Sequence, residues 1–346
     1  MKHLRLSIIG LGTVGQGLAE LLVRKQALLQ QHYGLEVTLV SVANSRHGFI
    51  YCEEGLHIPT LLELIATGRS LQEQPHVQHW QNALAGLQAT NADVLVEATG
   101  TNLQDAEPGI SHIRAALARG MHVVTANKGP VALAARELLQ LARQQQVQLR
   151  IEATLMAGTP VISTIHEGMA GAQVSGVRGI LNGTSNYILS AMAAGCDYAE
   201  ALAEAQAQGY AEADPTADVE GYDALAKTLI LAAMVFDYPL KPEQVARQGI
   251  TAISKERMQA AVQNGKRIKL IASLRRDMQS GSVEARVEPV EIPLSDPLAR
   301  IDGVTNAITV QSDTLAEVTV IGPGAGGLQT GQGLLADLIA ISACKN

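Results

Sequence analysis

A single lysine and five carboxylic acids occupy residues 209–227, and together they could bind a cationic substrate and exchange a proton with it. The acids are Glu212, Asp214, Asp218, Glu220 and Asp223. Asp223 and Lys227 are four residues apart and so share one face of a helix, which an Asp-Pro pair at its start predicts over 214–236. The rest of that helix is strongly apolar, so the charged face is expected to line a cleft; a surface ion pair is the alternative.

A second set of residues, Gly10-x-Gly12-x-x-Gly15, has the spacing of a dinucleotide-binding turn. Gly10 permits a tight turn after a strand, Gly12 lets the backbone approach a pyrophosphate, and Gly15 lets the following helix pack closely on the sheet. Free N–H groups at the helix N-terminus would then face the phosphates. Because a β-like run precedes the turn and a long helical pattern follows it, we expect dinucleotide binding rather than a plain glycine-rich turn.

Residues 42–47, which follow the second predicted strand, indicate which nicotinamide cofactor is bound. An acidic residue at this place would bond the ribose 2′-hydroxyl of NAD. The chain has neutral Asn44 instead, and Arg46 could pair with the 2′-phosphate of NADP. We therefore expect NADP to be preferred, with NAD possible; an ordinary polar loop is the alternative.

Lys128 ends the segment Thr125-Ala126-Asn127-Lys128, which directly follows another predicted strand. Ligands of parallel sheets bind at the carboxyl ends of the strands. Lys128 could therefore neutralise a phosphate or a carboxylate, or it could be a solvated loop lysine, and the spacing does not decide between the two.

Alternating strands and helices position these residues in the first half of the chain. Strands are predicted over 4–9, 36–42, 92–98, 121–125 and 147–151, and helices over 13–31, 110–119 and 133–145. This alternation is typical of a parallel sheet covered on both faces. After about residue 152 the pattern changes. Helices are predicted over 214–236 and 242–249, β-structure over 262–292, and a strand, a glycine-rich turn and a helix from 318 to 341.

Composition limits the class of protein. The chain has 346 residues, 47% of them hydrophobic and 3% aromatic, with a net charge of −7. A nucleic-acid partner would favour a basic excess or aromatic stacking platforms, so none is expected. No apolar run approaches the ~18 residues of a membrane span, and the N-terminus lacks a signal-peptide pattern. Three scattered cysteines without disulfide or zinc-ligand spacing favour a reducing compartment, so we expect a cytoplasmic protein that binds no membrane.

Taken together, the motifs resemble those of one family, homoserine dehydrogenase. The matching segments are 10–15, 124–128, 152–160, 179–188, 209–227, 296–298, Gly303, 306–307 and 322–326. They follow the family's order and cover nearly the whole chain. The most specific are Asn-Gly-Thr at 182–184 and Glu-Ala-Asp-Pro-Thr at 212–216.

The resemblance implies an α/β fold and a reaction. A Rossmann-type doubly wound nucleotide domain would comprise 1–151 and 322–346, a catalytic α+β segment 161–282, and a dimerisation region 152–160 with 283–321. The reaction would be reversible NAD(P)-dependent hydride transfer between L-homoserine and L-aspartate 4-semialdehyde, in threonine, methionine and isoleucine biosynthesis. Family members dimerise, so a homodimer is expected.

The resemblance also implies roles for individual residues. Lys227 would exchange the hydroxyl proton, protonated for reduction and neutral for oxidation. Glu212 and Asp223 would bind the substrate's ammonium group, Asp218 would support the pocket, and Lys128 would lie near substrate and cofactor. With the glycine turn and Arg46, the cofactor-binding positions are Gly10, Gly12, Thr13, Val14, Gly15, Arg46, Thr99, Lys128, Gly209 and Gly324.

The loop at 152–160 resembles the family's monovalent-cation site. Glu152 would supply a carboxylate, and Leu155, Ala157 and Thr159 would supply backbone carbonyls, a donor set that suits Na⁺ or K⁺. A plain turn is the alternative. A chain of this length has no room for the C-terminal regulatory domain that many members carry, so cooperative inhibition by threonine is not expected.

Two other functions fit the residues less well. An aldehyde dehydrogenase that forms a thioester needs an activated cysteine, whereas Cys52, Cys196 and Cys344 lie in a loop, a helical connection and the tail. A non-catalytic NADP sensor would need neither Lys227 nor Glu212. A thiol blocker would stop the first chemistry, and turnover of homoserine would exclude the second.

Overall fold

The computed structural model describes residues 1–46 and 48–343. Cys344, considered above as a thiol nucleophile, and His47 lie outside the described residues. The chain divides into two compact units, one of residues 1–158 with the chain from Ala325 onward, the other of residues 159–324. Among the described residues, no helix combines the length and the apolar character that crossing a membrane would require.

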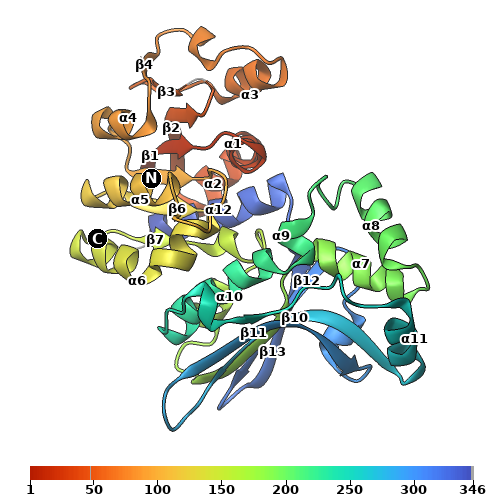
Figure 1. Cartoon of the computed structure of the whole chain (residues 1–346). Coiled ribbons are helices and arrows are strands. Elements are labelled where there is room, and N and C mark those ends of the chain that lie inside the picture. The colour runs from red at the N-terminus through yellow and green to blue at the C-terminus, as the bar shows by residue number, and fades with distance from the viewer. Residues whose placement is uncertain (47, 344–346) are drawn as a thin grey trace. The chain divides into compact units, whose positions relative to one another are not determined.

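The first unit is built on a seven-stranded sheet in the order β4-β3-β2-β1-β5-β6-β7 (Figure 1). Its strands are β1 (Lys2–Ile9), β2 (Leu35–Asn44), β3 (Gly48–Tyr51), β4 (Gln78–Trp80), β5 (Val94–Glu97), β6 (His122–Thr125) and β7 (Leu149–Arg150). β1 pairs in parallel with both β2 and β5, and β6 and β7 extend the parallel set. The chain thus winds outward from β1 in both directions, which confirms the predicted doubly wound sheet. Antiparallel β3 and β4 extend one edge.

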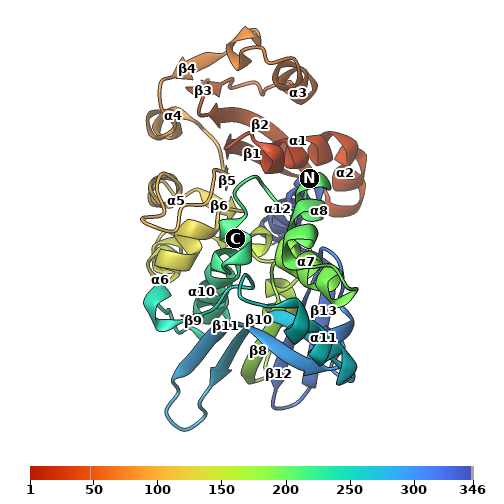
Figure 2. The ribbon, with the colours of Figure 1, turned by 45° about the vertical axis from the view of Figure 1, so that its right-hand side comes forward.

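Helices cover both faces of this sheet (Figure 2). One side carries α1 (Thr13–Arg24), α2 (Gln26–Tyr33), α3 (Ile58–Ala66) and α12 (Gly327–Ala343), and the other α4 (Ala83–Ala89), α5 (Gly109–Ala118) and α6 (Lys128–Gln144). Single 3₁₀ turns are η1 (Leu71–Glu73) and η2 (Glu152–Thr154). The C-terminal helix α12 packs on α1, because leucines such as Leu18 and Leu334 share one buried cluster with strand residues such as Ile8.

The second unit is built on a six-stranded sheet in the order β13-β12-β8-β10-β11-β9. Its strands are β8 (Val174–Ile180), β9 (Ala246–Arg247), β10 (Lys266–Arg276), β11 (Val283–Pro293), β12 (Thr305–Ser312) and β13 (Ala316–Pro323). Its helices are α7 (Gly183–Ala193), α8 (Tyr198–Ala207), α9 (Thr216–Val219), α10 (Tyr222–Phe236) and α11 (Lys255–Gln263), with short turns η3 (Thr164–Gly168), η4 (Pro242–Gln244) and η5 (Pro297–Arg300). α7, α10 and α11 all pack against β10.

Two helix predictions in the second unit are wrong. The helix expected over 214–236 is broken at Gly221, which has φ +78°, so a short α9 precedes α10. Pro215 precedes α9 as its N-cap residue, and the Asp214 carboxylate accepts a hydrogen bond from the Thr216 N–H. The helix expected over 242–249 is a 3₁₀ turn followed by β9, because residues 246–247 pair in parallel with β11.

Other boundaries also differ from the sequence prediction. The helix expected over 13–31 is interrupted at Lys25 and becomes α1 and α2. α6 begins at Lys128, five residues earlier than the pattern of residues 133–145 indicates. The β-structure expected over 262–292 is confirmed as the β10–β11 hairpin, and the strand, turn and helix from 318 as β13 and α12.

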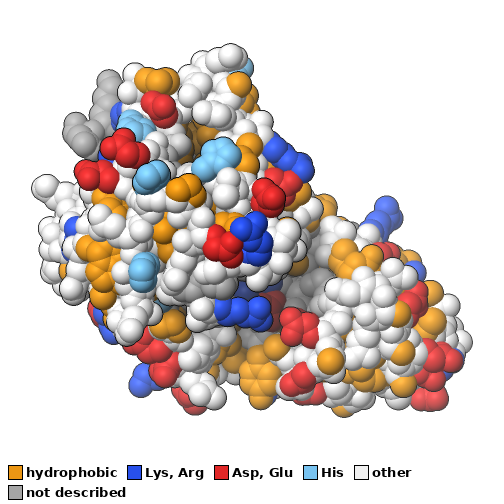
Figure 3. All heavy atoms as spheres, turned by 90° about the horizontal axis from the view of Figure 1, so that it is seen from above, with side chains coloured by type: hydrophobic (Ala, Val, Ile, Leu, Met, Phe, Trp, Pro, Cys, Tyr) orange, Lys and Arg blue, Asp and Glu red, His pale blue; other side chains and the backbone are white. Residues whose placement is uncertain are grey.

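The segments predicted as catalytic and dimerisation regions share one sheet. β8 and β10 come from the first and pair with β12 and β11 from the second. The structure therefore has two units where the sequence predicts three regions, with boundaries after Gly158 and Gly324. On the face shown in Figure 3, acidic and basic side chains are interspersed rather than gathered by sign.

Candidate active site

The glycine turn of the first unit has the geometry that its spacing predicts. Gly10 has φ +100°, and a Cβ there would lie 2.4 Å from the Ala98 backbone. A Cβ at Gly15 would lie 2.3 Å from the Gly10 carbonyl oxygen, whereas a Cβ at Gly12 would meet nothing within 4 Å. Gly10 and Gly15 are thus required by the fold itself. Gly12, the N-cap of α1, faces open space where a pyrophosphate could approach the helix N-terminus.

A cavity of about 620 Å³ lies beside this turn, at the carboxyl ends of β1, β2 and β5. It is lined by Gly10 and Gly12, by Asn44 and Ser45, and by the segment 98–100, among others. The sheet order reverses between β1 and β5, which is where doubly wound sheets bind ligands. The cavity and the open position at Gly12 fit a dinucleotide.

A buried polar network includes two of the residues that line this cavity, Thr99 and His112. The Glu97 carboxylate is fully buried and accepts hydrogen bonds from the Thr99 hydroxyl and, at 3.3 Å, from the Thr99 N–H. Asn127 Nδ2 donates to Thr99 Oγ1 over 3.1 Å, and His112 Nδ1 lies 3.5 Å from Glu97 Oε1. Hydrogen bonds to Glu97 and Asn127 therefore fix the Thr99 side chain at the edge of the cavity. Neither Glu97 nor His112 was predicted as a site residue; Thr99 is two residues from Glu97 in the chain, and His112 is fifteen residues from it.

The turn after β2 places Asn44 at the cavity and Arg46 in solvent. Asn44 Oδ1 accepts a hydrogen bond of 2.7 Å from the Arg46 N–H, so the asparagine side chain fixes the turn that carries the arginine. Arg46 is exposed. No carboxylate from residues 42–46 enters this part of the cavity.

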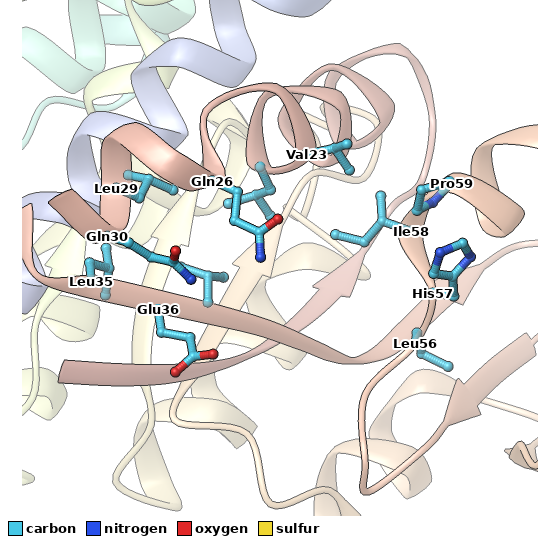
Figure 4. Close-up of a pocket in the computed structure, with 12 residues that line it drawn as sticks. Val23, Gln26, Leu29, Gln30, Leu35, Glu36, Leu56, His57, Ile58 and Pro59 are labelled. Atoms are coloured by element: carbon cyan, nitrogen blue, oxygen red, sulfur yellow. The ribbon is translucent and has the colours of Figure 1, made fainter. Parts of the chain in front are cut away.

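A cavity of about 250 Å³ elsewhere in the first unit carries none of the predicted site residues (Figure 4). It lies between the C-terminal half of α1, α2, β2 and the start of α3, with Gln26, Glu36 and His57 among mainly aliphatic side chains. It is remote from the N-terminus of α1, where an anion would bind, so it is not the cofactor site.

Lys227 occupies a buried cluster in the second unit. Its side chain is 6% exposed, and its Nζ lies 2.8 Å from Asp223 Oδ2, one turn earlier on α10. Nζ also donates a hydrogen bond of 2.5 Å to the Leu181 carbonyl at the end of β8. The break at Gly221 leaves Asp223 and Lys227 on one helix, so the predicted pairing is present, and it is buried rather than on the surface.

Asn182 joins two aspartates to this cluster. Its Nδ2 donates hydrogen bonds to Asp218 Oδ1 at 2.7 Å and to Asp223 Oδ2 at 3.1 Å. Burial raises the pKa of Asp218; the Asn182 N–H opposes that shift, and the nearby Asp223 charge adds to it. The cluster therefore holds two acidic groups and one basic group in a half-buried setting. Asn182 belongs to the Asn-Gly-Thr segment of the sequence, but no role was predicted for it.

Another buried lysine in the second unit has a structural role. Lys269 Nζ donates hydrogen bonds to Asn186 Oδ1 at 3.0 Å, to Asp302 Oδ1 at 2.9 Å and to the Ile301 carbonyl. These contacts tie β10 to α7 and to the turn before β12. Because Lys269 is surrounded by partners that anchor a loop, it is a weaker candidate for proton exchange than Lys227.

The remaining predicted substrate and cofactor residues lie outside this cluster. Glu212 and Gly209 are exposed, and the Glu212 backbone carbonyl accepts a 3.1 Å hydrogen bond from Gln206 Nε2. Lys128 is the first residue of α6, at the carboxyl end of β6 in the first unit. Gly324 packs directly on the buried Asn306 amide, because a Cβ at Gly324 would lie 2.2 Å from Asn306 Nδ2.

The predicted cation-site residues follow β7. Glu152 is buried, and its N–H donates a 2.9 Å hydrogen bond to Asp337 Oδ2 of α12. Leu155 and Ala157 are also buried, and Ala157 has the unusual φ of +50°. Thr159, in the second unit, donates its hydroxyl to the Pro323 carbonyl. Carbonyls with one buried carboxylate are a donor set that fits a monovalent cation.

The fold and the two sites together define a class of protein. A doubly wound sheet with room for a pyrophosphate at its glycine turn binds a dinucleotide. A buried lysine beside a carboxylate can exchange a proton with an alcohol or an aldehyde. These are the requirements of a nicotinamide-dependent oxidoreductase.

Comparison with known proteins identifies the family. Residues 10–152 match the family model described as homoserine dehydrogenase, NAD binding domain, and residues 160–339 match the one described as homoserine dehydrogenase. An NAD(+)-dependent homoserine dehydrogenase from Pseudomonas canavaninivorans is 41% identical over 99% of this chain and 97% of its own. A homoserine dehydrogenase from Methanocaldococcus jannaschii is 36% identical over 96% of this chain and 97% of its own.

Solved structures agree. A putative homoserine dehydrogenase from Archaeoglobus fulgidus, 36% identical, superposes with a TM-score of 0.87 over 99% of this chain and 100% of its own. A mutant hyperthermophilic archaeal homoserine dehydrogenase in complex with NADPH is 28% identical and superposes with a TM-score of 0.84 over 99% of this chain and 98% of its own.

The chain belongs to the homoserine dehydrogenase family. It is an NAD(P)-dependent oxidoreductase that acts on a CH–OH group, and it interconverts L-homoserine and L-aspartate 4-semialdehyde in amino-acid biosynthesis. The function and fold class predicted from the sequence are confirmed.

Proposed function

We propose that Lys227 exchanges the hydroxyl proton of the substrate during hydride transfer. The observation that carries this proposal is the burial of its ammonium group between the Asp223 carboxylate and the Leu181 carbonyl. The nicotinamide cofactor, when bound, accepts or supplies the hydride. In reduction Lys227 donates its proton to the developing alkoxide, and in oxidation its neutral form takes the proton from the alcohol.

Acidic residues of the same unit bind the amino-acid part of the substrate in this proposal. Asp223 and Glu212 hold the ammonium group, and Asp218 supports the pocket from its place beside Asn182. Lys128, the first residue of α6, neutralises a negatively charged group of the substrate or the cofactor in this proposal. Support comes from the charge of the Asp218–Asp223 pair, which complements an ammonium ion.

Turnover is tested by following NADPH and NADH oxidation with L-aspartate 4-semialdehyde, and NADP⁺ and NAD⁺ reduction with L-homoserine. A matched substrate control is L-threonine, which keeps the amino-acid part but carries its hydroxyl on a different carbon. We expect turnover of L-aspartate 4-semialdehyde and L-homoserine, and no turnover of L-threonine. Equal turnover of threonine would show that the site does not select the position of the alcohol.

NADP is proposed as the preferred cofactor. The support is local: Asn44 is neutral, and it holds the turn from which Arg46 could reach a 2′-phosphate. The Pseudomonas relative is named NAD(+)-dependent, so the ratio of the two cofactors in this chain is a direct test. We expect kcat/KM to favour NADPH, and Arg46→Ala to reduce that preference. A wild-type ratio that is equal or favours NADH contradicts the proposal.

A monovalent cation, Na⁺ or K⁺, is proposed at Glu152, Leu155, Ala157 and Thr159. The test replaces NaCl or KCl with choline chloride at constant ionic strength and measures both thermal stability and turnover. We expect the wild type to lose stability in choline, and Glu152→Gln to be insensitive to the exchange. Identical melting curves of the wild type in all three salts would contradict the site.

A homodimer in the cytoplasm is also proposed, on the resemblance to the family. The exposed Ile321 on the edge strand β13 is consistent with an interface along the second sheet. Analytical ultracentrifugation is expected to show twice the chain mass. A concentration-independent monomer would refute the dimer.

A further inference from the structure

Asn182 stands at the junction between β8 and α7 and uses both ends of its side-chain amide. It is 5% exposed. Its Oδ1 accepts hydrogen bonds from the Ser185 N–H at 2.8 Å and the Ser185 hydroxyl at 2.9 Å, which caps the N-terminus of α7. Its Nδ2 donates to Asp218 and Asp223. A primary amide has two N–H groups on that nitrogen, so each aspartate receives one of them.

The amide offsets part of the repulsion between the two aspartates. Asp218 faces the Asp223 carboxylate, the Lys227 ammonium group and the Thr184 hydroxyl, and burial already favours its neutral form. An N–H that donates to a carboxylate favours the ionised form. Like charges at short range would otherwise let the pair share one proton. A neutral residue with two donors is therefore well suited to this position.

We propose that Asn182 is a positioning residue for the reaction: its amide orients the carboxylates of Asp218 and Asp223 and offsets the repulsion between them, so that both face the substrate's ammonium group. The proposal rests on the substrate role given to these aspartates above. Asp223 also contacts Lys227, so the same amide fixes the carboxylate against which the proton-exchanging group is held.

A purely structural role for Asn182, as the N-cap of α7, is the alternative. The two roles use opposite ends of the amide, so substitutions can separate them. Asn182→Asp keeps the capping oxygen and nearly the same shape but replaces the donor with a third carboxylate. Asn182→Ser keeps a side chain that caps helices well and adds no charge, but it removes both N–H donors.

We expect Asn182→Ser to raise the homoserine KM about 10- to 100-fold, as lost hydrogen bonds to charged groups typically do, with a smaller change in kcat. The Asn182 amide opposes protonation of Asp218, so Asn182→Ser should raise the pKa of Asp218. The acidic limb of the kcat/KM profile of this variant should therefore move to higher pH. Asn182→Asp should lose more activity than Asn182→Ser. Cofactor affinity, measured by NADPH titration, should be unchanged in both variants.

Ser254→Ala is the matched control, because Ser254 caps α11 in the same unit and the structure gives it no contact with the cluster. It should lower the melting temperature and leave the KM and pH profile as in the wild type. If Asn182→Ser behaves in the same way, or if Asn182→Asp is as active as the wild type, Asn182 is only a helix cap and the proposal is overturned. Should Asn182→Ser not fold, Asn182→Asp alone decides, since it keeps the cap.

Asp223→Ala, measured in parallel, separates this proposal from the assignment of substrate ligands. If Asp223→Ala leaves the homoserine KM unchanged, that assignment fails, and the role of Asn182 fails with it. If Asp223→Ala is impaired while Asn182→Ser is normal, only the role of Asn182 is wrong.

Discussion

Replacing Lys227 tests the proposed chemistry most directly. Loss of a general acid–base group typically lowers the rate by about 10²–10⁴-fold. At about 1.36 kcal/mol per tenfold, this corresponds to roughly 2.7–5.4 kcal/mol of transition-state stabilisation. We therefore expect Lys227→Ala to lower kcat by this factor in both directions, with much smaller changes in KM. NADPH affinity should not change, because the cofactor cavity lies in the other unit.

Folding must be separated from chemistry in this variant. Lys227 is buried, and removing one partner of a buried ion pair costs about 3–5 kcal/mol. The Asp223 side chain is 20% exposed and can be partly solvated, which places the cost at or below the lower end of that range. Lys227→Arg is the matched control, because it keeps the cation beside Asp223 but carries a guanidinium group that does not release its proton.

The assay combines steady-state kinetics in both directions with melting curves, NADPH titration, and added methylamine as a small replacement base. Proton exchange by Lys227 predicts that Lys227→Arg is also inactive and that methylamine restores part of the turnover of Lys227→Ala. An active Lys227→Arg would mean that only the positive charge matters. A near-normal kcat in folded Lys227→Ala, or loss of NADPH binding instead, would refute the assignment and make Lys128 the leading candidate.

Three further predictions concern individual positions. Gly12→Ala should weaken NADPH binding without lowering the melting temperature, because a Cβ at Gly12 meets nothing in the protein. Gly15→Ala should destabilise the fold by roughly 1–3 kcal/mol, because its Cβ meets the Gly10 carbonyl oxygen. Equal melting temperatures of the two variants would contradict this. Glu212→Ala should raise the homoserine KM about tenfold or more and leave kcat nearly unchanged, as steady-state kinetics would show. Asp218→Asn should raise the melting temperature at neutral pH. Because burial raises the folded-state pKa of Asp218, ionisation above that pKa costs stability, and the gain should vanish in acid, where Asp218 is protonated in both states.

Local patterns predicted the parts of the structure that local chemistry determines. The glycine turn follows from spacing, because Gly10 has a positive φ and a Cβ at Gly15 would meet the Gly10 carbonyl oxygen five residues earlier; the contact of Gly10 with Ala98 is long-range and is not part of the pattern. The Asp223–Lys227 pair follows from helical periodicity, which survived the wrong start of the helix since both residues lie after Gly221. The division into α/β halves follows from the alternation of apolar runs.

Long-range pairing explains what the patterns missed. Residues 246–247 are a strand only because they pair with β11, about forty residues later. The break at Gly221 brings that residue against Val287 of β11, a contact that no local pattern contains. Asn182 reaches its aspartates across 36 and 41 residues, so its role could not be read from its neighbours in the chain.

The end of β8 shows how a short motif can be specific without containing Lys227, the proposed acid–base group. Leu181 and Asn182 are consecutive, and the first receives Lys227 on its carbonyl while the second serves both aspartates with its amide. One dipeptide therefore fixes the Lys227 ammonium group and its carboxylate neighbours relative to the same stretch of backbone. A residue with almost any side chain could supply the backbone carbonyl at position 181. At position 182, the two hydrogen-bond donors require a side-chain amide of the length of asparagine. The constraint on the site therefore falls on residue 182 as well as on Lys227, 45 residues later in the chain.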